Sequence, residues 1–260
     1  MSERKSYVIF ISAAVFIAVF WLYLFTLPPT VAPYRDAGEM SSLAEMFGIA
    51  HPSGYPLYVI ASKINSIVMF IGDRAYALAV FSALSAAAAC LLLFLIILYL
   101  SEKMCPRLKF SYRAALCVSG AVLFAASDKL WYAAQVQEMY SLSILLIFAA
   151  MLLFTVFFYN RGNAAILYAG SLVFGLALAN RPDAVLISGF MFFLLAGFHK
   201  EMLLKYGIRF FYAGLFCALG VLIYGYLMVR SGTGPYMNWN SPDTLESFLS
   251  TVTRETHGHT

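Results

Sequence analysis

Seven runs of apolar residues dominate the sequence and limit what it can fold into. A run of about 20 apolar residues is long enough to cross the hydrocarbon core of a bilayer as a helix. With 62% hydrophobic and only 12% charged residues, the composition excludes an ordinary soluble domain. The sequence therefore predicts an all-α integral membrane protein of about seven transmembrane helices. The runs cover approximately residues 7–27, 77–100, 114–127, 141–158, 164–180, 184–198 and 210–228.

The charged residues indicate how these spans are oriented. If the N-terminus is cytoplasmic, the short inner segments contain ten of the 17 Lys and Arg residues but only three of the 13 Asp and Glu residues. The ten are Arg4, Lys5, Lys103, Arg107, Lys109, Arg113, Arg161, Lys200, Lys205 and Arg209. This excess follows the positive-inside rule for short loops. We therefore expect a cytoplasmic N-terminus and an outer C-terminus, in a bacterial or archaeal plasma membrane or an ER membrane. Because the basic residues are dispersed, we expect no nucleic-acid partner.

Two long segments, 28–76 and 229–260, are expected outside the membrane. From Leu57 to Ile71, apolar residues recur at helical spacing, which predicts a helix lying in the interface plane; a partial eighth span is the alternative. We interpret residues 128–139 as an outer loop, and we expect a short helix that begins at Pro242 in the tail. Since no internal repeat or linker is visible, residues 1–260 are expected to form a single membrane domain.

The first outer segment contains an unusual group of ionisable residues. Asp36 and Glu39 are three positions apart, so a helix there would place both carboxylates on one face. One could accept a proton from an acceptor while the other orients it, although a solvated pair of loop carboxylates has the same spacing. His51, between Ala50 and Pro52, could donate to a phosphate or cap a turn.

Two further residues are candidates because of their position at the ends of spans. Glu138 directly precedes the fourth span, where a carboxylate usually has a partner or a role. Arg181 follows the fifth span and could hold a phosphate bidentately. An interfacial arginine, or an ion pair with Asp183, is the alternative for Arg181.

Taken in order, these motifs resemble the GT-C membrane glycosyltransferases, in the branch of the transmembrane protein O-mannosyltransferases and their bacterial relatives. The resemblance depends on residues 36–39 (DAGE), 48–58 (GIAHPSGYPLY), 138–142 (EMYSL), 238–239 (NW) and Pro242. This chain departs from the family pattern at Ser53, Met139 and Asn240, and in the turn that contains Arg181. Many relatives continue well past this length, so we expect a short form or a fragment.

The resemblance implies transfer of a mannose-like hexose from a polyprenyl-phosphate donor to a protein Ser/Thr or glycan hydroxyl, on the extracytoplasmic face and with inversion. Asp36 and Glu39 would be the catalytic residues. Arg181 and His51 would bind the donor phosphate, and Glu138 and Tyr55 would position the acceptor. No carboxylates are spaced as Asp-x-Asp, so no metal or other cofactor is predicted besides the lipid-linked co-substrate; a metal held by the Asp36-x-x-Glu39 pair is the alternative. A lipid or solute transporter or flippase, and a non-catalytic membrane assembly subunit, are the alternatives.

Overall fold

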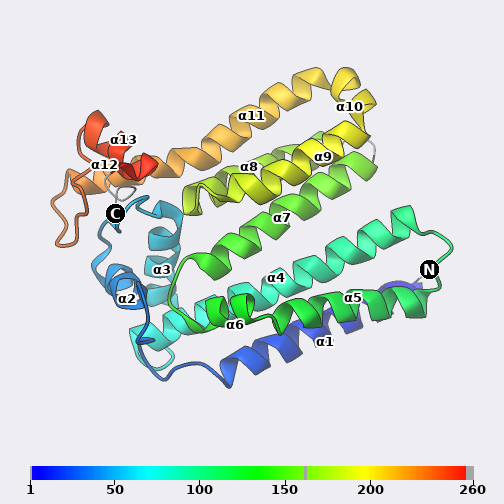
Figure 1. Cartoon of the computed structure of the whole chain (residues 1–260), viewed down its shortest axis with the longest axis horizontal. Coiled ribbons are helices and arrows are strands. Elements are labelled where there is room, and N and C mark those ends of the chain that lie inside the picture. Colours follow the sequence, from blue (N-terminus) through cyan, green and yellow to red (C-terminus); the bar gives the residue numbers. More distant parts are fainter. Residues whose placement is uncertain (1, 161–162, 256–260) are drawn as a thin grey trace.

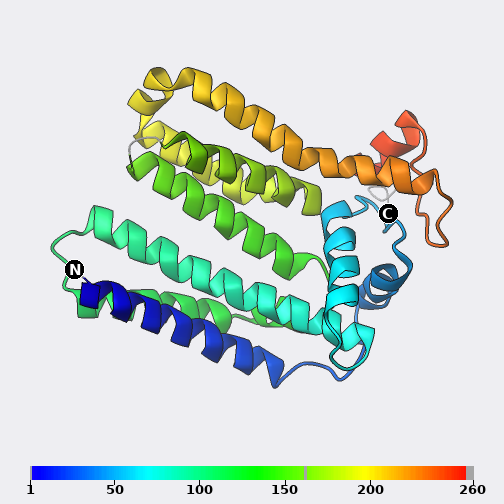
Figure 2. The same ribbon diagram turned by 180° about the vertical axis from the view of Figure 1, so that it is seen from behind.

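The computed structural model describes residues 2–160 and 163–255, and these residues are predominantly helical. Long helices run side by side along the long axis of the molecule (Figure 1, Figure 2). They are α1 (Ser2–Leu24), α4 (Arg74–Met104), α5 (Phe110–Ala125), α7 (Tyr140–Tyr159), α8 (Ala164–Asn180), α9 (Phe190–Phe198) and α11 (Gly207–Val221). A π-helical turn, η1 (Val185–Gly189), leads into α9, and α11 continues through η2 (Leu222–Tyr224) into α12 (Gly225–Ser231). The all-helical prediction is confirmed.

The short helices lie at the two ends of this bundle. One end carries α2 (Ala37–Met46), α3 (Pro56–Val68), α6 (Asp128–Gln135) and α13 (Leu245–Thr253) (Figure 1). The opposite end carries α10 (Lys200–Lys205) and the turn between α4 and α5. The segments that the sequence predicts to be outside therefore gather at one end.

The predicted inner segments meet at the opposite end of the bundle. There the start of α1 lies beside the end of α4, and an ion pair joins them, with 2.5 Å between Arg4 Nη2 and Glu102 Oε1. Arg161, one of the predicted inner cations, lies outside the described residues.

Several helices fit a multi-pass membrane protein. Within the described residues, four are long and apolar enough to cross a bilayer: Arg4–Leu24, Arg74–Met104, Tyr140–Tyr159 and Gly207–Ser231. Helices α5 and α6 meet this test only as a pair bent by 62°. The predicted spans 164–180 and 184–198 form helices that are shorter than these four. Large apolar side chains cover the outside of the bundle, among them Phe10 (72% exposed) and Leu123 (73% exposed), as expected of a surface that faces lipid.

Close backbone contact between α8 and α11 requires glycine. A Cβ atom on Gly175 would lie 2.1 Å from the carbonyl oxygen of Cys217, and one on Gly220 would lie 2.7 Å from that of Leu172. Small residues allow membrane helices to approach in this way, which increases van der Waals contact where the hydrophobic effect between helices is weak.

Most of the predicted segment 57–71 forms helix α3, which spans Pro56–Val68 and ends three residues before Ile71. The helix is amphipathic. Tyr58 and Val59 on α3 are buried against the bundle, whereas Ile64, Ile67 and Val68 are exposed. The position of α3 in the membrane interface stays a prediction.

Two local predictions are wrong. Residues 128–135 form helix α6 rather than a loop, because Leu130, Ala133 and Ala134 recur at helical spacing and are buried. The tail helix begins at Leu245 rather than Pro242. Its N-cap is Thr244, which exchanges hydrogen bonds with Ser247 in a capping box, whereas Ser241 has a positive φ of 43° that cannot continue into a helix.

Candidate active site

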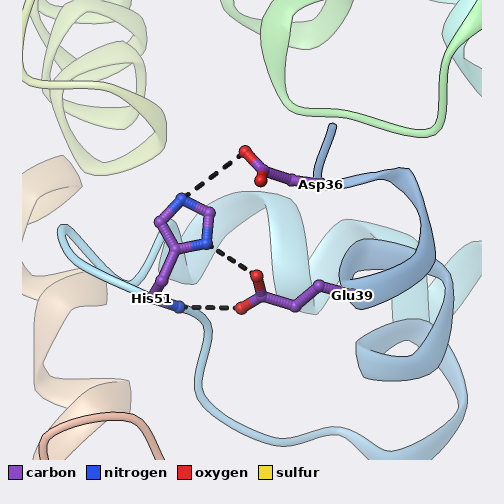
Figure 3. Close-up of side chains that lie close together, drawn as sticks. All are labelled: Asp36, Glu39 and His51. Carbon is purple, nitrogen blue, oxygen red and sulfur yellow. Dashed lines mark hydrogen bonds and ion pairs between the residues drawn. The ribbon is translucent and has the colours of Figure 1, made fainter. Parts of the chain in front are cut away.

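Helix α2 places two carboxylates at its start. Asp36 occupies the N-cap position and Glu39 lies in the first turn, where negative charge is favoured by the helix dipole. Burial of Met40 and Leu43 on the same helix fixes it against the bundle. The predicted shared face is therefore present, and it points toward the loop that contains His51 (Figure 3).

Glu39 holds His51 through two hydrogen bonds. The His51 backbone amide donates to Glu39 Oε1 at 2.9 Å, and His51 Nδ1 lies 2.8 Å from Glu39 Oε2 (Figure 3). Burial by itself raises the pKa of Glu39, but the bonds from His51 outweigh burial and hold this pKa below its ordinary value. The bond to Glu39 raises the pKa of His51. A proton on Nδ1 leaves His51 Nε2 directed toward Asp36, with 3.7 Å between Nε2 and Asp36 Oδ2.

Tyr55 borders the same histidine. Its hydroxyl oxygen lies 3.5 Å from His51 Nε2, and the two rings meet edge to face with centroids 5.2 Å apart. Burial raises the pKa of Tyr55 to about 12, so its hydroxyl keeps its proton at neutral pH. The structure thus brings Tyr55 together with Asp36, Glu39 and His51.

Glu138 is fully buried (0% exposed) in the short connection between α6 and α7. Neither carboxyl oxygen has a hydrogen-bond partner within the described part of the chain. Burial, and next the nearby Asp36 carboxylate, raise the pKa of Glu138. The structure therefore places Glu138, the residue predicted to position the acceptor, close to Asp36, the residue predicted to take the proton.

The segment after α12 closes the site from another side. Residues Ile49 and Asn238 form an isolated parallel bridge, in which the Ile49 amide donates to the Met237 carbonyl oxygen at 2.8 Å. This bridge brings the Trp239 ring to 6.4 Å from the His51 ring, edge to face. We did not assign Trp239 to the site from the sequence, although the Asn238–Trp239 pair was part of the family resemblance.

Helix α12 also anchors the loop that contains His51. The Tyr226 hydroxyl donates to the Gly48 carbonyl oxygen at 2.7 Å, and Arg230 Nε donates to that of Phe47 at 2.6 Å. These bonds fix the chain just before His51 without contributing a group to the site.

Arg181 is paired with Asp183 rather than with Asp36 or Glu39. Its guanidinium forms two bonds to Asp183, at 2.9 Å from Nε to Oδ1 and 2.5 Å from Nη2 to Oδ2. It also lies over the Tyr140 ring, 4.6 Å from the centroid, and lines a cavity of about 210 Å³ between α7 and η1. Its positive charge is therefore already compensated, and its role in binding a donor phosphate stays a prediction.

Asp36, Glu39 and His51 are also the residue types that bind metal ions, and one ligand atom from each lies within 4.8 Å of the others. Glu39 uses both oxygens to bond His51. A metal ion here would have to replace the bond between Glu39 and His51 Nδ1 to gain the three or four protein ligands of a typical zinc site.

Comparison with known proteins identifies the family to which the chain belongs. Residues 36–204 match the model of the protein O-mannosyl-transferase TMEM260 N-terminal domain, and this match begins at Asp36. The chain belongs to this family. The sequence-based resemblance to transmembrane O-mannosyltransferases is therefore confirmed.

The family also includes full-length relatives from animals and amoebae. The chain is 30% identical to protein O-mannosyl-transferase TMEM260 of Mus musculus over 254 residues, which are 95% of this chain and 34% of the mouse protein. It is 26% identical to protein O-mannosyl-transferase tmem260 of Dictyostelium discoideum over 267 residues, 94% of this chain and 30% of the relative. The chain thus spans about a third of the length of these relatives. No solved structure matches it.

Proposed function

We propose that this chain is the membrane-embedded catalytic part of a protein O-mannosyltransferase. It would move a mannose-like hexose from a polyprenyl-phosphate donor to a Ser or Thr hydroxyl on the extracytoplasmic face of the membrane. The names of the relatives support mannosyl transfer to protein, and the apolar bundle beneath the site supports a lipid-linked donor. The observation on which the proposal depends is the position of Asp36, an accessible carboxylate (40% exposed side chain) beside His51 and the buried Glu138.

Asp36 acts as the general base of a single inverting displacement. It accepts the proton of the acceptor hydroxyl while the hydroxyl oxygen forms a bond to the anomeric carbon. The bond from that carbon to the phosphate oxygen breaks, and the lipid phosphate leaves with the bonding electrons. Glu39 does not face the acceptor directly; its two bonds to His51 hold the imidazole where Nε2 faces Asp36. Cationic or hydrogen-bonding groups near the leaving phosphate, such as His51 and Arg181, stabilise its developing charge.

Tyr55 and Glu138 orient the acceptor. Burial raises the pKa of Tyr55 to about 12, so its hydroxyl keeps its proton at neutral pH, and burial also raises the pKa of Glu138. The Tyr55 hydroxyl can donate to an acceptor oxygen without competing with Asp36 for the proton. Trp239 provides an aromatic wall near His51, a surface on which a sugar ring can stack.

The test is Asp36→Asn, which keeps the size of the side chain but cannot accept a proton at neutral pH. Transfer of radiolabelled hexose from a polyprenyl-phosphate donor to a Ser/Thr peptide is measured in proteoliposomes. We expect a fall of about 10²-fold or more, the range for loss of a general base, with donor binding retained. The matched control is Asp243→Asn, an exposed aspartate near α13. Near-normal turnover of Asp36→Asn in an active preparation would show that Asp36 is not the base.

A non-catalytic assembly subunit is the second candidate function, because the relatives whose names give the transferase activity are proteins of which the chain matches about a third. A wild-type chain that binds the donor but transfers hexose to no acceptor would favour this candidate.

The proposal includes seven transmembrane spans: α1, α4, α5, α7, α8, η1 with α9, and α11. Their parallel arrangement in Figure 1 supports this count, and so does the gathering of the predicted outer segments at one end. The N-terminus is then cytoplasmic and the site is outside. Helix α3 lies in the outer interface with its exposed Ile64, Ile67 and Val68 toward lipid.

A further inference from the structure

A cavity of about 450 Å³ lies beside the candidate active site, between the loop before α2 and helices α6 and α7. It is lined by two basic residues, Arg35 and Lys129, and by three tyrosines, Tyr34, Tyr132 and Tyr140. Within the described residues neither Arg35 nor Lys129 forms an ion pair, although Asp128 also lines the cavity. This sets them apart from Arg181, whose guanidinium is already bound to Asp183.

Arg35 is held in place by its backbone and by aromatic rings. It has a positive φ of 43°, which non-glycine residues rarely adopt, and it directly precedes Asp36. Its Cζ lies 5.7 Å from the centroid of the Tyr34 ring and 5.9 Å from that of the Tyr132 ring. The Arg35 guanidinium also has a hydrogen bond with the Tyr140 side chain. A guanidinium has five N–H donors, and cation–π contacts use the face of the ring rather than an acceptor atom, so the remaining N–H groups can bind an anion beside Tyr140.

An unsatisfied hydroxyl lies in the same wall. The Tyr132 hydroxyl is shielded from solvent and has no hydrogen-bond partner among the described residues. Two cations and one hydroxyl donor around one cavity match the needs of a phosphate group, which accepts several charge-assisted bonds.

An apolar track leads away from this polar cavity. The neighbouring cavity of about 210 Å³ shares Tyr140 and Ile144 with it and continues to Ile147 and Ile187. Tyr140, Ile144 and Ile147 follow each other at helical spacing on one face of α7, so they lead from the loop end into the apolar part of the bundle. A ligand that fits both cavities has an anionic head and an apolar chain.

We propose that Arg35 and Lys129 bind the phosphate of a lipid-borne phosphate ester, whose chain lies along Ile144, Ile147 and Ile187. This inference rests on the proposed function in one respect, because it identifies that phosphate with the leaving group of the sugar donor. It places the main phosphate contacts on residues that we did not select from the sequence. Arg181 borders the shared Tyr140 from the neighbouring cavity and is bound to Asp183, so Arg35 and Lys129 are the cations whose charge no ion pair compensates among the described residues of the two cavities.

The first experiment measures binding of a radiolabelled polyprenyl monophosphate to the purified full chain in phosphatidylcholine nanodiscs. We expect Arg35→Gln and Lys129→Gln each to weaken binding by about tenfold, as for loss of a charge-assisted hydrogen bond. Arg35→Lys should recover part of the loss, and added salt should weaken wild-type binding because both cations are exposed. The matched control is Lys109→Gln, an exposed lysine at the opposite end of the bundle. Unchanged binding in a folded Arg35→Gln, Lys129→Gln double variant would overturn the proposal.

Competition distinguishes the sources of the phosphate. We expect inorganic phosphate not to displace the probe at equal concentration and phosphatidic acid to displace it only weakly. Equal competition by inorganic phosphate would overturn the role of the lipid chain. Equal competition by phosphatidic acid would assign the site to bilayer phospholipid rather than to a sugar donor.

Kinetics separate this inference from the proposed function. Arg35→Gln should raise KM for the sugar donor more than it lowers kcat, whereas Asp36→Asn should lower kcat. A wild-type chain with Arg35-dependent binding but no transfer would refute the proposed function and leave the phosphate site intact. Active transfer with an unaltered donor KM in Arg35→Gln would refute the phosphate site alone.

Discussion

Replacing Glu39 with glutamine isolates the charge in the bond between Glu39 and His51. Both side chains are mostly buried, at 17% and 12% exposed, so solvent screens their interaction little. In Glu39→Gln the amide oxygen can still accept from the His51 backbone, but the amide N–H₂ then faces Nδ1. Nδ1 must become the acceptor, and the proton of the imidazole moves to Nε2, next to Asp36. The substitution therefore changes the tautomer of His51 as well as the charge.

The pH dependence follows from the two pKa shifts. The pKa of His51 is raised above 6.5, so its contribution to stability is complete below pH 6.5 and is lost as pH rises through the folded-state pKa. The pKa of Glu39 is lowered below 4.5, so its contribution is present above pH 4.5 and is lost as pH falls through the folded-state pKa. The difference in stability between the wild type and Glu39→Gln is thus greatest between pH 4.5 and 6.5.

The expected size of this difference is about 1–2 kcal/mol, the excess of a charge-assisted hydrogen bond over a neutral one. For a chain of this size it corresponds to a shift of about 2–8 °C in Tm. The assay is thermal unfolding of both proteins in the same detergent at pH 5.5, 7 and 8.5, followed by tryptophan fluorescence. A Tm difference that stays constant from pH 5.5 to 8.5 would refute the reasoning, because a neutral contact has no such pH dependence.

Three further predictions follow from other contacts. Glu138→Gln should raise stability relative to wild type as pH increases above 4.5, because a raised pKa means that the folded state resists ionisation; a Tm difference that falls with pH would contradict this. Gly175→Ala should destabilise the bundle by about 1–3 kcal/mol, because the added methyl group overpacks against α11. Gly214→Ala should not, because the space around its Cβ is open. Equal Tm values for these two variants would show that α8 and α11 can move apart at little cost. In a cysteine-free background, a cysteine at Tyr236 should react with an impermeant maleimide in intact cells and one at Lys109 only after permeabilisation; equal labelling would refute the proposed orientation.

Much of the fold could be predicted because lipid imposes a simple rule on sequence. A backbone in lipid must satisfy its own hydrogen bonds, so each apolar run is expected to form a helix. The distribution of charge predicts which connecting segments share an end of the bundle. Helix α6 was missed because its eight residues combine Asp128, Lys129 and Gln135 with buried alanines, a pattern too short and too polar to read as a helix without its packing. The start of α13 was misplaced because Ser241 has cap chemistry but a backbone that turns the wrong way.

The candidate site was predicted in part. Spacing along one helix suggested that Asp36 and Glu39 share a face, and the structure places both next to His51. The sequence could not show that Glu39 is engaged by His51, because that pairing depends on where a loop turns. The ion pair of Arg181 with Asp183, expected from the sequence as an alternative, is present. The sequence did not indicate Arg35, because no motif or spacing marks a single loop arginine as part of a binding site. Its position in the wall of the cavity distinguishes it from other surface cations.

The anchoring of the His51 loop on α12 affects how the protein is made. The Tyr226 hydroxyl and the Gly48 carbonyl oxygen that it contacts are 178 positions apart in the chain. The loop leaves the ribosome long before α11 and α12 are synthesised, so it must wait without its final contacts while the intervening helices are inserted. In nascent chains arrested before Tyr226, residues 47–55 should therefore be cleaved by protease. They should become protected from cleavage only when α12 has been synthesised and has bound the loop. On the proposed function, a site that closes so late keeps partly synthesised chains from acting on lipid donors.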